Sequence, residues 1–428
     1  MNFENTFEFA QKLDADDVLK SFRSQFFIPI LHGKESIYFR GNSIGLQPRT
    51  AQDMVLNEME DWATYGAEGN QLARNPWLNY HEVFSKKLAP VLGALPEEII
   101  VMNQLTTNLH LLLTTFYRPT KERFKIICEE YSFSSDRFAI LSHLELAGYT
   151  EEALIIVKAE EGKYTIKDEA IIKAIKDCGE ELALVIIGGV SFYTGQLFDL
   201  KSITKAAHEV GALCGFDLAH AVGNVPLQLH DWEVDFAFWC SYKYLNGGPG
   251  GIGGAFIHQR YATDSTLPRL AGWWGQNKEK RFDQNSIFNP TPSAEGWQLS
   301  GPPILSLSVQ RASLDIFEQA DFENIIQKGK MLSAYFIFIL KEMNKAAGRE
   351  LVEIITPENE EAHGCQISFR LSENGKHFFE IFRKNSILLD WFEPDVIRVA
   401  PIPLYNKFEE IYTFGQVFLK NIHSANLK

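Results

Sequence analysis

A single lysine near the middle of the chain stands where an amine could become a nucleophile. The apolar run 236–240 ends in Ser241, Tyr242 and Lys243, and six glycines follow between positions 247 and 254. An amine at the end of a buried strand, facing a glycine-rich loop, can be desolvated and so made reactive. A solvated lysine in a hairpin turn has the same local sequence, so the rest of the chain must decide between the two interpretations.

Four further apolar runs are each followed at once by side chains that can bind or react. Asp217 and His220 follow the run 213–216, and serines with Asp136 follow the run 125–128. Each signal alone is weak, because an aspartate can simply cap a helix. The segments after the four runs are 103–106, 131–136, 188–195 and 217–220.

Helical patterns alternate with these apolar runs between about residues 95 and 260. Amphipathic stretches at 107–117, 136–146 and 203–210 separate most of the runs. Such alternation predicts a mostly parallel sheet with helices on both faces. Because ligands bind at the carboxyl ends of the strands in such sheets, we expect the side chains after the runs to meet at one edge.

The C-terminal part of the chain has a different pattern. A double proline at 302–303 precedes an expected helix at 304–319, and apolar residues alternate along 366–371. A helix near 378–384, a strand at 396–399 and a last helix complete a smaller α+β domain. We therefore expect an N-terminal segment (1–32) that packs with the small domain, a large cofactor-binding domain (33–303) and a small C-terminal domain (304–428).

Composition excludes several classes of partner. The formal net charge of −14 disfavours nucleic acid and anionic membrane surfaces. Five widely spaced cysteines without a CxxC pair indicate reduced thiols, neither a disulfide framework nor a zinc site. The N-terminus lacks a secretory pattern, and no apolar run approaches the roughly 18 residues of a membrane span. We expect a cytoplasmic protein without a metal.

Two motifs match known fingerprints in letters only. Residues 248–253 fit GxGxxG, but an apolar strand and not a helix follows them, so a dinucleotide site is rejected. Residues 41–45 fit the GxSxG of a nucleophile elbow. Only about 40 residues precede Ser43, too few for the strands and oxyanion loop of an α/β-hydrolase. A serine hydrolase that uses Ser43 stays open as the alternative from another class.

The lysine and the strand-end aspartate together favour pyridoxal 5'-phosphate. Lys243 could form a Schiff base with the aldehyde, and Asp217 could pair with the pyridine nitrogen and keep it protonated. Phe133 could stack on the ring, and the helix start at Leu105 and Thr106 could bind the phosphate. The alternative, in which Asp217 caps a loop and Lys243 is solvated, explains less of the surrounding pattern.

The chain resembles the kynureninases in six stretches that run in order from about residue 38 to 406. The stretches are YFRGNSIGLQPR, MNQLTTNLHLL, YSFSSD, GGVSFYTGQ, GFDLAHAVGNVPLQLHDWEVDFAFWCSYKYLNGGPGGIGGAFIH and IRVAPIPLYN. FDLAHAVGN followed by CSYKYLN is specific and separates this family from the related cysteine desulfurases.

The resemblance implies an α/β fold of the aspartate aminotransferase-like type (fold-type I). In it, a large domain with a mostly parallel seven-stranded sheet accompanies a smaller α+β domain. The implied activity is hydrolytic Cβ–Cγ cleavage of L-kynurenine, 3-hydroxy-L-kynurenine or both. The products would be L-alanine with anthranilate or 3-hydroxyanthranilate, in tryptophan catabolism and NAD biosynthesis, and the cofactor would be pyridoxal 5'-phosphate.

The resemblance also implies roles for individual residues. Lys243, Tyr242 and Asp217 would be catalytic, with Tyr242 as the candidate for relaying a proton. Trp273 matches the tryptophan that reaches the cofactor site of the neighbouring subunit, which implies a homodimer. Arg398 would grip the substrate α-carboxylate, and Ser43, Ala67 and Tyr193 would join it in binding the substrate. The implied cofactor-binding residues are Leu105, Thr106, Phe133, Ser134, Ser135, Asp136, Gly188, Asp217, His220, Tyr242, Lys243, Trp273 and Gly301.

Three positions depart from the family pattern. Ala67 stands where animal enzymes carry a histidine, and Gly301 stands where they carry an asparagine before the double proline. Both positions bear on the preference for the 3-hydroxyl of the substrate ring, so this preference is open. Gly188 replaces a serine near the cofactor phosphate, so a contact there would need the backbone or a water.

Four other functions remain as alternatives. A cysteine desulfurase or an aminotransferase would use the same cofactor, and a desulfurase would need a cysteine in a mobile loop. Cys365 is the only cysteine worth testing for that role. A serine hydrolase would react with a fluorophosphonate, and a binding protein without activity would show neither colour nor turnover.

Overall fold

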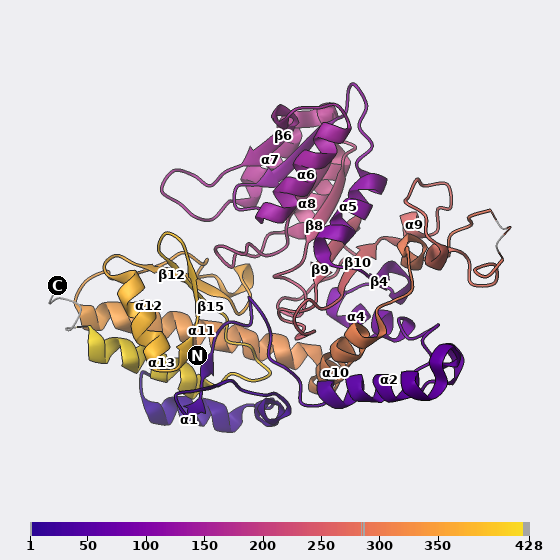
Figure 1. The fold of residues 1–428 in the computed structure, drawn as a ribbon. Helices are drawn as coiled ribbons and strands as arrows, with labels where there is room; N and C mark the ends of the chain where they lie inside the picture. The colour runs from indigo at the N-terminus through magenta and orange to yellow at the C-terminus, as the bar shows by residue number, and fades with distance from the viewer. Residues whose placement is uncertain (1, 284, 286, 423–428) are drawn as a thin grey trace.

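The computed structural model describes residues 2–283, 285 and 287–422 (Figure 1). Its largest sheet has seven strands in the order β4-β10-β9-β8-β7-β5-β6. The strands are β4 (Ile99–Val101), β5 (Lys125–Glu129), β6 (Leu154–Val157), β7 (Leu182–Gly188), β8 (Leu213–Asp217), β9 (Phe236–Cys240) and β10 (Gly253–Ile257). Strands β6, β5, β7, β8 and β9 are parallel, and only β10 runs antiparallel to its neighbours β9 and β4. The expected seven-stranded, mostly parallel α/β fold is confirmed.

Helices cover both faces of this sheet, because its strands are apolar on both sides. Along β5, Ile126 and Cys128 belong to one core, whereas Ile127 belongs to the other. Helices α5 (Leu105–Phe116) and α6 (Ser134–Leu146) pack in the first core. Helices α4 (Glu82–Leu92), α7 (Asp168–Cys178) and α8 (Leu200–Glu209) pack in the second. The expected helices that became α5, α6 and α8 begin two or three residues earlier than predicted.

A second, four-stranded antiparallel sheet lies in the C-terminal part, in the order β11-β12-β15-β14. Its strands are β11 (Val352–Ile354), β12 (Ile367–Leu371), β14 (Asp390–Phe392) and β15 (Val396–Val399). The helices around it are α10 (Ile304–Ala320), α11 (Phe322–Ala347), α12 (Gly375–Lys384) and α13 (Phe408–Asn421). The 26-residue helix α11 was not among the expected elements.

The N-terminal helix α1 (Phe7–Asp16) packs against α13 (Figure 1). Asp14 accepts hydrogen bonds from the backbone N–H groups of Phe408 (2.7 Å) and Glu409 (2.9 Å), where α13 begins. Asp17 forms a buried ion pair with Lys328 of α11 at 2.7 Å. We keep the domain limits at residues 32 and 303 as a proposal.

The remaining elements are short, apart from α2. They are β1 (Ile30–Leu31), β2 (Lys34–Glu35), β3 (Ile37–Tyr38), α2 (Ala51–Tyr65), α3 (Gly69–Leu72), α9 (Gln259–Ala262) and β13 (Ile387–Leu388). Strand β3 pairs with β13 and so ties the segment before the large sheet to the C-terminal part. Within the described ranges, no helix combines the length and apolar character that a membrane crossing requires.

Candidate active site

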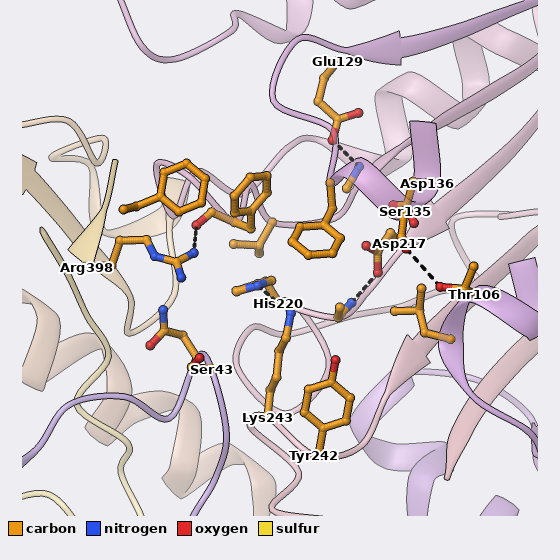
Figure 2. Close-up of a pocket in the computed structure, with 18 residues that line it drawn as sticks. Ser43, Thr106, Glu129, Ser135, Asp136, Asp217, His220, Tyr242, Lys243 and Arg398 are labelled. Carbon is orange, nitrogen blue, oxygen red and sulfur yellow. Dashed lines mark hydrogen bonds between the residues drawn. The ribbon is translucent and has the colours of Figure 1, made fainter. Parts of the chain in front are cut away.

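A cavity of about 330 Å³ lies at the carboxyl edge of the large sheet, and β14 and β15 of the small sheet contribute to its wall (Figure 2). The ends of β5, β7 and β8 and the turn after β9 all contribute lining residues. The structure brings together twelve of the residues that the sequence singled out. They are Ser43, Leu105, Thr106, Phe133, Ser135, Asp136, Gly188, Asp217, His220, Tyr242, Lys243 and Arg398.

Lys243 projects into the cavity from the turn after β9, whose five residues are all buried. Its Nζ lies 2.8 Å from Nε2 of His220. Burial, reinforced by the charge of Lys243, holds the pKa of His220 well below its usual value. The imidazole is therefore neutral at neutral pH and can accept a hydrogen bond from the Lys243 amine. The ring of Phe133 lies 5.9 Å from the same Nζ.

Asp217 ends strand β8 and forms an acidic pair with Asp136 of α6. Its Oδ1 accepts a hydrogen bond of 2.7 Å from the Ala219 N–H. Burial raises the pKa of Asp217, and the charge of Lys243 opposes that rise. The pKa of Asp136 is raised well above its usual value by burial and by the neighbouring Asp217 charge. Of the two acids, Asp136 therefore holds its proton more tightly, and Asp217 is the one that ionises more readily.

The first turn of α5 offers an anion-binding end to the cavity. Gln104 caps the helix without a side-chain hydrogen bond, so the backbone N–H groups near Leu105 and Thr106 are available. The Thr106 hydroxyl lies 3.0 Å from the Ser135 hydroxyl. Tyr242 lines the same cavity, and burial raises the pKa of its phenol, which keeps its proton.

Arg398 enters the cavity from β15, on the other side of Lys243 from Thr106 (Figure 2). One terminal nitrogen donates to the Phe192 carbonyl at 2.8 Å, and the other donates to Asp390 at 3.2 Å. Asp390 faces Arg398 across the strand pair and also accepts from Nε of Arg40 at 2.7 Å. Nε of Arg398 is buried without a partner, so this guanidinium is oriented but not saturated.

Five predicted residues do not line this cavity in the single chain. Ser134 is exposed at the start of α6, and Tyr193 is buried, with its ring stacked on Tyr131 at 4.5 Å. Ala67 is exposed in the short 3-10 turn Gly66–Glu68 after α2. The remaining two are Trp273, which is 49% exposed, and the exposed Gly301.

Six residues line the cavity that sequence reasoning did not single out. They are Asn42, Glu129, Val190, Phe192, Ala219 and Phe392. Glu129 directly follows an apolar run, so the signal that identified Asp217 could have found it. Asn42 is 1% exposed, and neither polar atom of its amide has a partner. Its position beside Ser43 was the available signal.

The residues of the cavity fit pyridoxal 5'-phosphate. An aldehyde would meet the amine of Lys243, a basic ring nitrogen would meet Asp217, and a phosphate would meet the free N–H groups of α5. Several buried polar atoms of the lining side chains lack a protein partner, which suits a polar ligand. These atoms are Oε2 of Glu129, Oδ1 of Asp136, Nδ1 of His220 and Nε of Arg398.

Among the residues that the structure describes, two groups of side chains could hold a metal ion, and neither lines the cavity. One consists of Glu98, His230 and His258, and the other of His81, Glu82 and Glu295. In the first group, Oε1 of Glu98 already accepts from the His230 ring and from the Gln259 N–H, each at 2.8 Å. Glu98 therefore serves as a hydrogen-bond acceptor that joins loops at the amino edge of the sheet.

Sequence comparisons link the whole chain to known enzymes. A family model described as Aminotransferase class-V matches residues 37–382. The kynureninase of Flavobacterium psychrophilum is 50% identical over 99% of this chain and 99% of its own length. The kynureninase of Myxococcus xanthus is 46% identical over 96% of each chain.

Comparison with solved structures supports the same fold at lower identity. The cysteine desulfurase of Thermococcus onnurineus has a TM-score of 0.73 at 20% identity and covers 91% of this chain and 95% of its own. The cystine C-S lyase C-DES, in complex with its product cysteine persulfide, has a TM-score of 0.74 at 16% identity. That match covers 90% of this chain and 97% of the lyase chain.

Proposed function

The chain belongs to the class-V aminotransferase family and, within it, to the kynureninases, and we propose that it hydrolyses L-kynurenine, 3-hydroxy-L-kynurenine or both. Water and the substrate would give L-alanine and anthranilate or 3-hydroxyanthranilate. The observation that carries this proposal is the meeting of Lys243, Asp217 and Arg398, which come from two different sheets, in one cavity.

The cofactor of this family fits the residues of the cavity. Pyridoxal 5'-phosphate supplies, when bound, an aldehyde that condenses with amines and a ring that takes up the electrons of a breaking carbon bond. Lys243 would be the attachment point, and Asp217 would pair with the ring nitrogen. The start of α5, with Ser135 and Tyr242, would hold the phosphate. Ser134 lies beside this group and would contribute through its backbone.

Arg398 is the anchor for the substrate α-carboxylate. Its guanidinium is held by Asp390 and by the Phe192 carbonyl, so little side-chain freedom is lost when a carboxylate binds. Burial lowers its pKa, yet the group stays charged, because arginine ionises far above neutral pH. A charged and largely buried donor gives a strong and directional contact.

Proton transfers fall to Lys243 and Tyr242. The free Lys243 amine would remove the proton from the substrate α-carbon, and the neutral His220 imidazole, which accepts its hydrogen bond, fixes its orientation. The Tyr242 phenol keeps its proton at neutral pH and can deliver it to the carbon left by the departing aromatic acyl group. Solvent then returns the proton to Tyr242.

The aromatic end of the substrate would lie near Phe192, Phe392 and Ser43, which line the cavity around Arg398. Asn42 is a buried hydrogen-bonding group on the same wall. A site that hydrogen-bonds a ring hydroxyl discriminates more strongly than one that only packs around it. The ratio of kcat/KM for kynurenine to that for 3-hydroxykynurenine measures the substrate preference. The change of this ratio in the Asn42→Ala variant measures how much Asn42 contributes to the preference.

A homodimer forms part of the proposal. Trp273, Phe282 and Ile287 are 49%, 68% and 89% exposed in the single chain. Large exposed apolar side chains grouped in one segment are typical of an interface. We infer that this segment packs on a second copy, where Trp273 reaches the partner's cavity and Ala67 and Gly301 approach the substrate pocket. A cytoplasmic location belongs to the same proposal.

The alternative functions have less support in the cavity. A desulfurase needs a reactive cysteine, and none of the described residues that line the cavity is a cysteine. Cys365 is buried elsewhere, and burial raises its pKa to about 12, so it stays a thiol. An aminotransferase would leave a keto acid in place of alanine. For a serine hydrolase, the nearby His220 would be the base, but its Nε2 already faces Lys243.

The direct test is a product assay on the purified protein with kynurenine. We expect a yellow protein that forms anthranilate and alanine in equal amounts, and a colourless, inactive Lys243→Ala variant. A Lys243→Ala protein that kept full activity would contradict the proposal. Inhibition by a fluorophosphonate, together with indifference to cofactor removal, would instead support the hydrolase.

A further inference from the structure

Glu129 is a buried acid of the cavity to which neither the motifs nor the proposed reaction gives a role. It is the last residue of β5 and is 4% exposed. Its Oε1 accepts a hydrogen bond of 3.0 Å from the Gly188 N–H, and its Oε2 has no partner (Figure 2). A buried polar atom that faces a cavity without a partner is costly unless a ligand or a proton compensates it.

The two acidic neighbours of Glu129 make this position more unusual. Asp136 from α6 and Asp217 from β8 line the same cavity, and the charge of Asp217 acts directly on Glu129. Among the described residues, the other titratable groups that interact with these carboxyls are the Cys128 and Cys240 thiols, the Tyr242 phenol and Lys243, and the neutral His220 lies beside Lys243. Lys243 acts on Asp136 and Asp217, and Glu129 interacts with both of these acids, so the three carboxyls form one coupled group.

Gly188 fits closely with the carboxyl that lies over it. A Cβ added at this position would approach Oε1 of Glu129 to 3.2 Å and the Val190 carbonyl oxygen to 3.3 Å. The absent side chain thus leaves room for the carboxylate to approach the strand end and accept the backbone hydrogen bond. The Glu129 carboxyl therefore lies beside Gly188, which is one of the positions where this chain departs from the family pattern.

Glu129 differs from the buried acids that only support the fold. Both oxygens of Asp235 are hydrogen-bonded, to His208, Tyr261, Arg260 and the Cys214 N–H. Glu129 has one backbone donor and one open oxygen, so its charge is poorly compensated. Burial, with the charge of Asp217 as a smaller contribution, raises the pKa of Glu129 to about 7.

We propose that Glu129 is a positioning residue for the cofactor: its carboxyl, fixed by the Gly188 N–H through one oxygen and open to the cavity through the other, sets the negative charge beside Asp217 by binding or releasing a proton. Below neutral pH the carboxyl is neutral. Above neutral pH it is ionised and, with the cofactor bound, would favour protonation of the cofactor nitrogens near Asp217 and Lys243. This inference rests on the proposed cofactor role of Lys243 and adds the residue that tunes it.

Substitution of glutamine for Glu129 removes the titration and keeps the acceptor for the Gly188 N–H. The readout is the pH midpoint at which the visible absorption of the bound cofactor changes, measured on the holoenzyme without substrate. Because E129Q lacks the negative charge, we expect its midpoint to move to lower pH by about 0.5 unit or more. A midpoint within about 0.1 unit of the wild type would overturn the inference.

Glu130→Gln is the matched control. Glu130 is the next residue, is exposed, and accepts from the Ala159 N–H at 3.1 Å. It carries the same charge, but solvent screens it, so its removal should leave the midpoint unchanged. A shift in E130Q equal to that in E129Q would show that overall charge is responsible and would overturn the inference.

The infrared difference spectrum of the wild-type holoenzyme between pH 6 and pH 8 tests the same idea without relying on a variant's stability. We expect a protonated-carboxyl band that disappears as the pH rises and that is missing from the E129Q difference spectrum. Absence of this band in the wild type would contradict the inference. A wild type without any cofactor absorption would contradict the proposed function first and the inference with it.

Discussion

Two acids at opposite edges of the same sheet, the partly buried Asp217 and the fully buried Asp235, have different roles. Asp217 closes β8 at the carboxyl edge, whereas Asp235 precedes β9 at the amino edge. Burial would raise the pKa of Asp235, but hydrogen bonds and charges from His208 and Arg260 lower it below the usual value. The pKa of Asp217 is raised instead. A satisfied acid supports the fold, and an unsatisfied acid marks a place where a ligand is expected.

The largest expected effect that separates the two acids is on activity. Asp217→Asn keeps the shape but removes the charge opposite the ring nitrogen, so kcat should fall by roughly 100-fold or more. The melting temperature of the apoenzyme should change little, because the native acid is poorly compensated. Steady-state kinetics and thermal unfolding on the same preparation check both statements. A D217N enzyme with wild-type kcat would contradict the proposed difference between the two acids.

Asp235→Asn should show the opposite pattern. Its removal leaves His208 and the buried end of Arg260 without their anion, which should lower the free energy of unfolding by about 3 kcal/mol. The activity of each folded molecule should stay within about two-fold, because no atom of Asp235 lines the cavity. Urea unfolding with active-site titration checks this, and a loss of activity without a loss of stability would contradict it.

Two arginines of the small sheet extend the contrast. Arg398→Lys replaces an oriented, planar guanidinium that can bind a carboxylate through two N–H groups by a compact ammonium. We expect kcat/KM to fall by about 10-fold to 100-fold, mainly because KM rises. Arg370 on the neighbouring strand β12 is a third exposed and pairs with Asp395 at 2.9 Å. Arg370→Lys is the matched control and should leave kcat/KM within about two-fold. Equal losses in the two variants would remove Arg398 as the substrate anchor.

The smallest effect concerns how stability depends on pH. The pKa of Glu129 is about 7 in the fold, above the ordinary value for a glutamate of about 4.3. Its folded state therefore holds the proton more tightly, so this contribution is fully present below about pH 4.3 and is lost as the pH rises to about 7. Between pH 4.5 and pH 7.5, the free energy of unfolding of the Glu129→Gln apoenzyme should therefore fall by about 1–3 kcal/mol less than that of the wild-type apoenzyme. If the free energy of unfolding changed equally with pH in the two proteins, this prediction would be wrong.

Much of the site was predictable because strand ends are local signals. Lys243 and Asp217 each follow an apolar run, and a parallel sheet brings such ends to one edge. Glu129 carries the same signal and was overlooked. Helix α11 also had local signals, with Asp321 accepting from the Glu323 N–H at its start and Gly348 in the left-handed conformation at its end.

Other features could not be deduced from local sequence. The partners of Asp235 lie 21 to 27 residues away, so nothing beside it distinguished it from Asp217. Arg398 lies in a different sheet, and only the family resemblance indicated its role. The reversal of β10 depends on pairing with β4, which lies about 150 residues earlier, and period-two patterns do not encode strand direction. Asn42 stands beside Ser43 in the sequence, but that its buried amide lacks a partner in the cavity wall is a property of the fold alone.

The central claim is that Lys243 is the amine that carries the cofactor, and reductive trapping tests it most directly. Borohydride treatment of the holoenzyme fixes the cofactor to its lysine, and mass spectrometry of the digested protein then identifies the modified peptide. The account predicts a single pyridoxyl group on Lys243 and none in the Lys243→Ala protein. A modified lysine anywhere else, or no modification of a yellow and active protein, would contradict it.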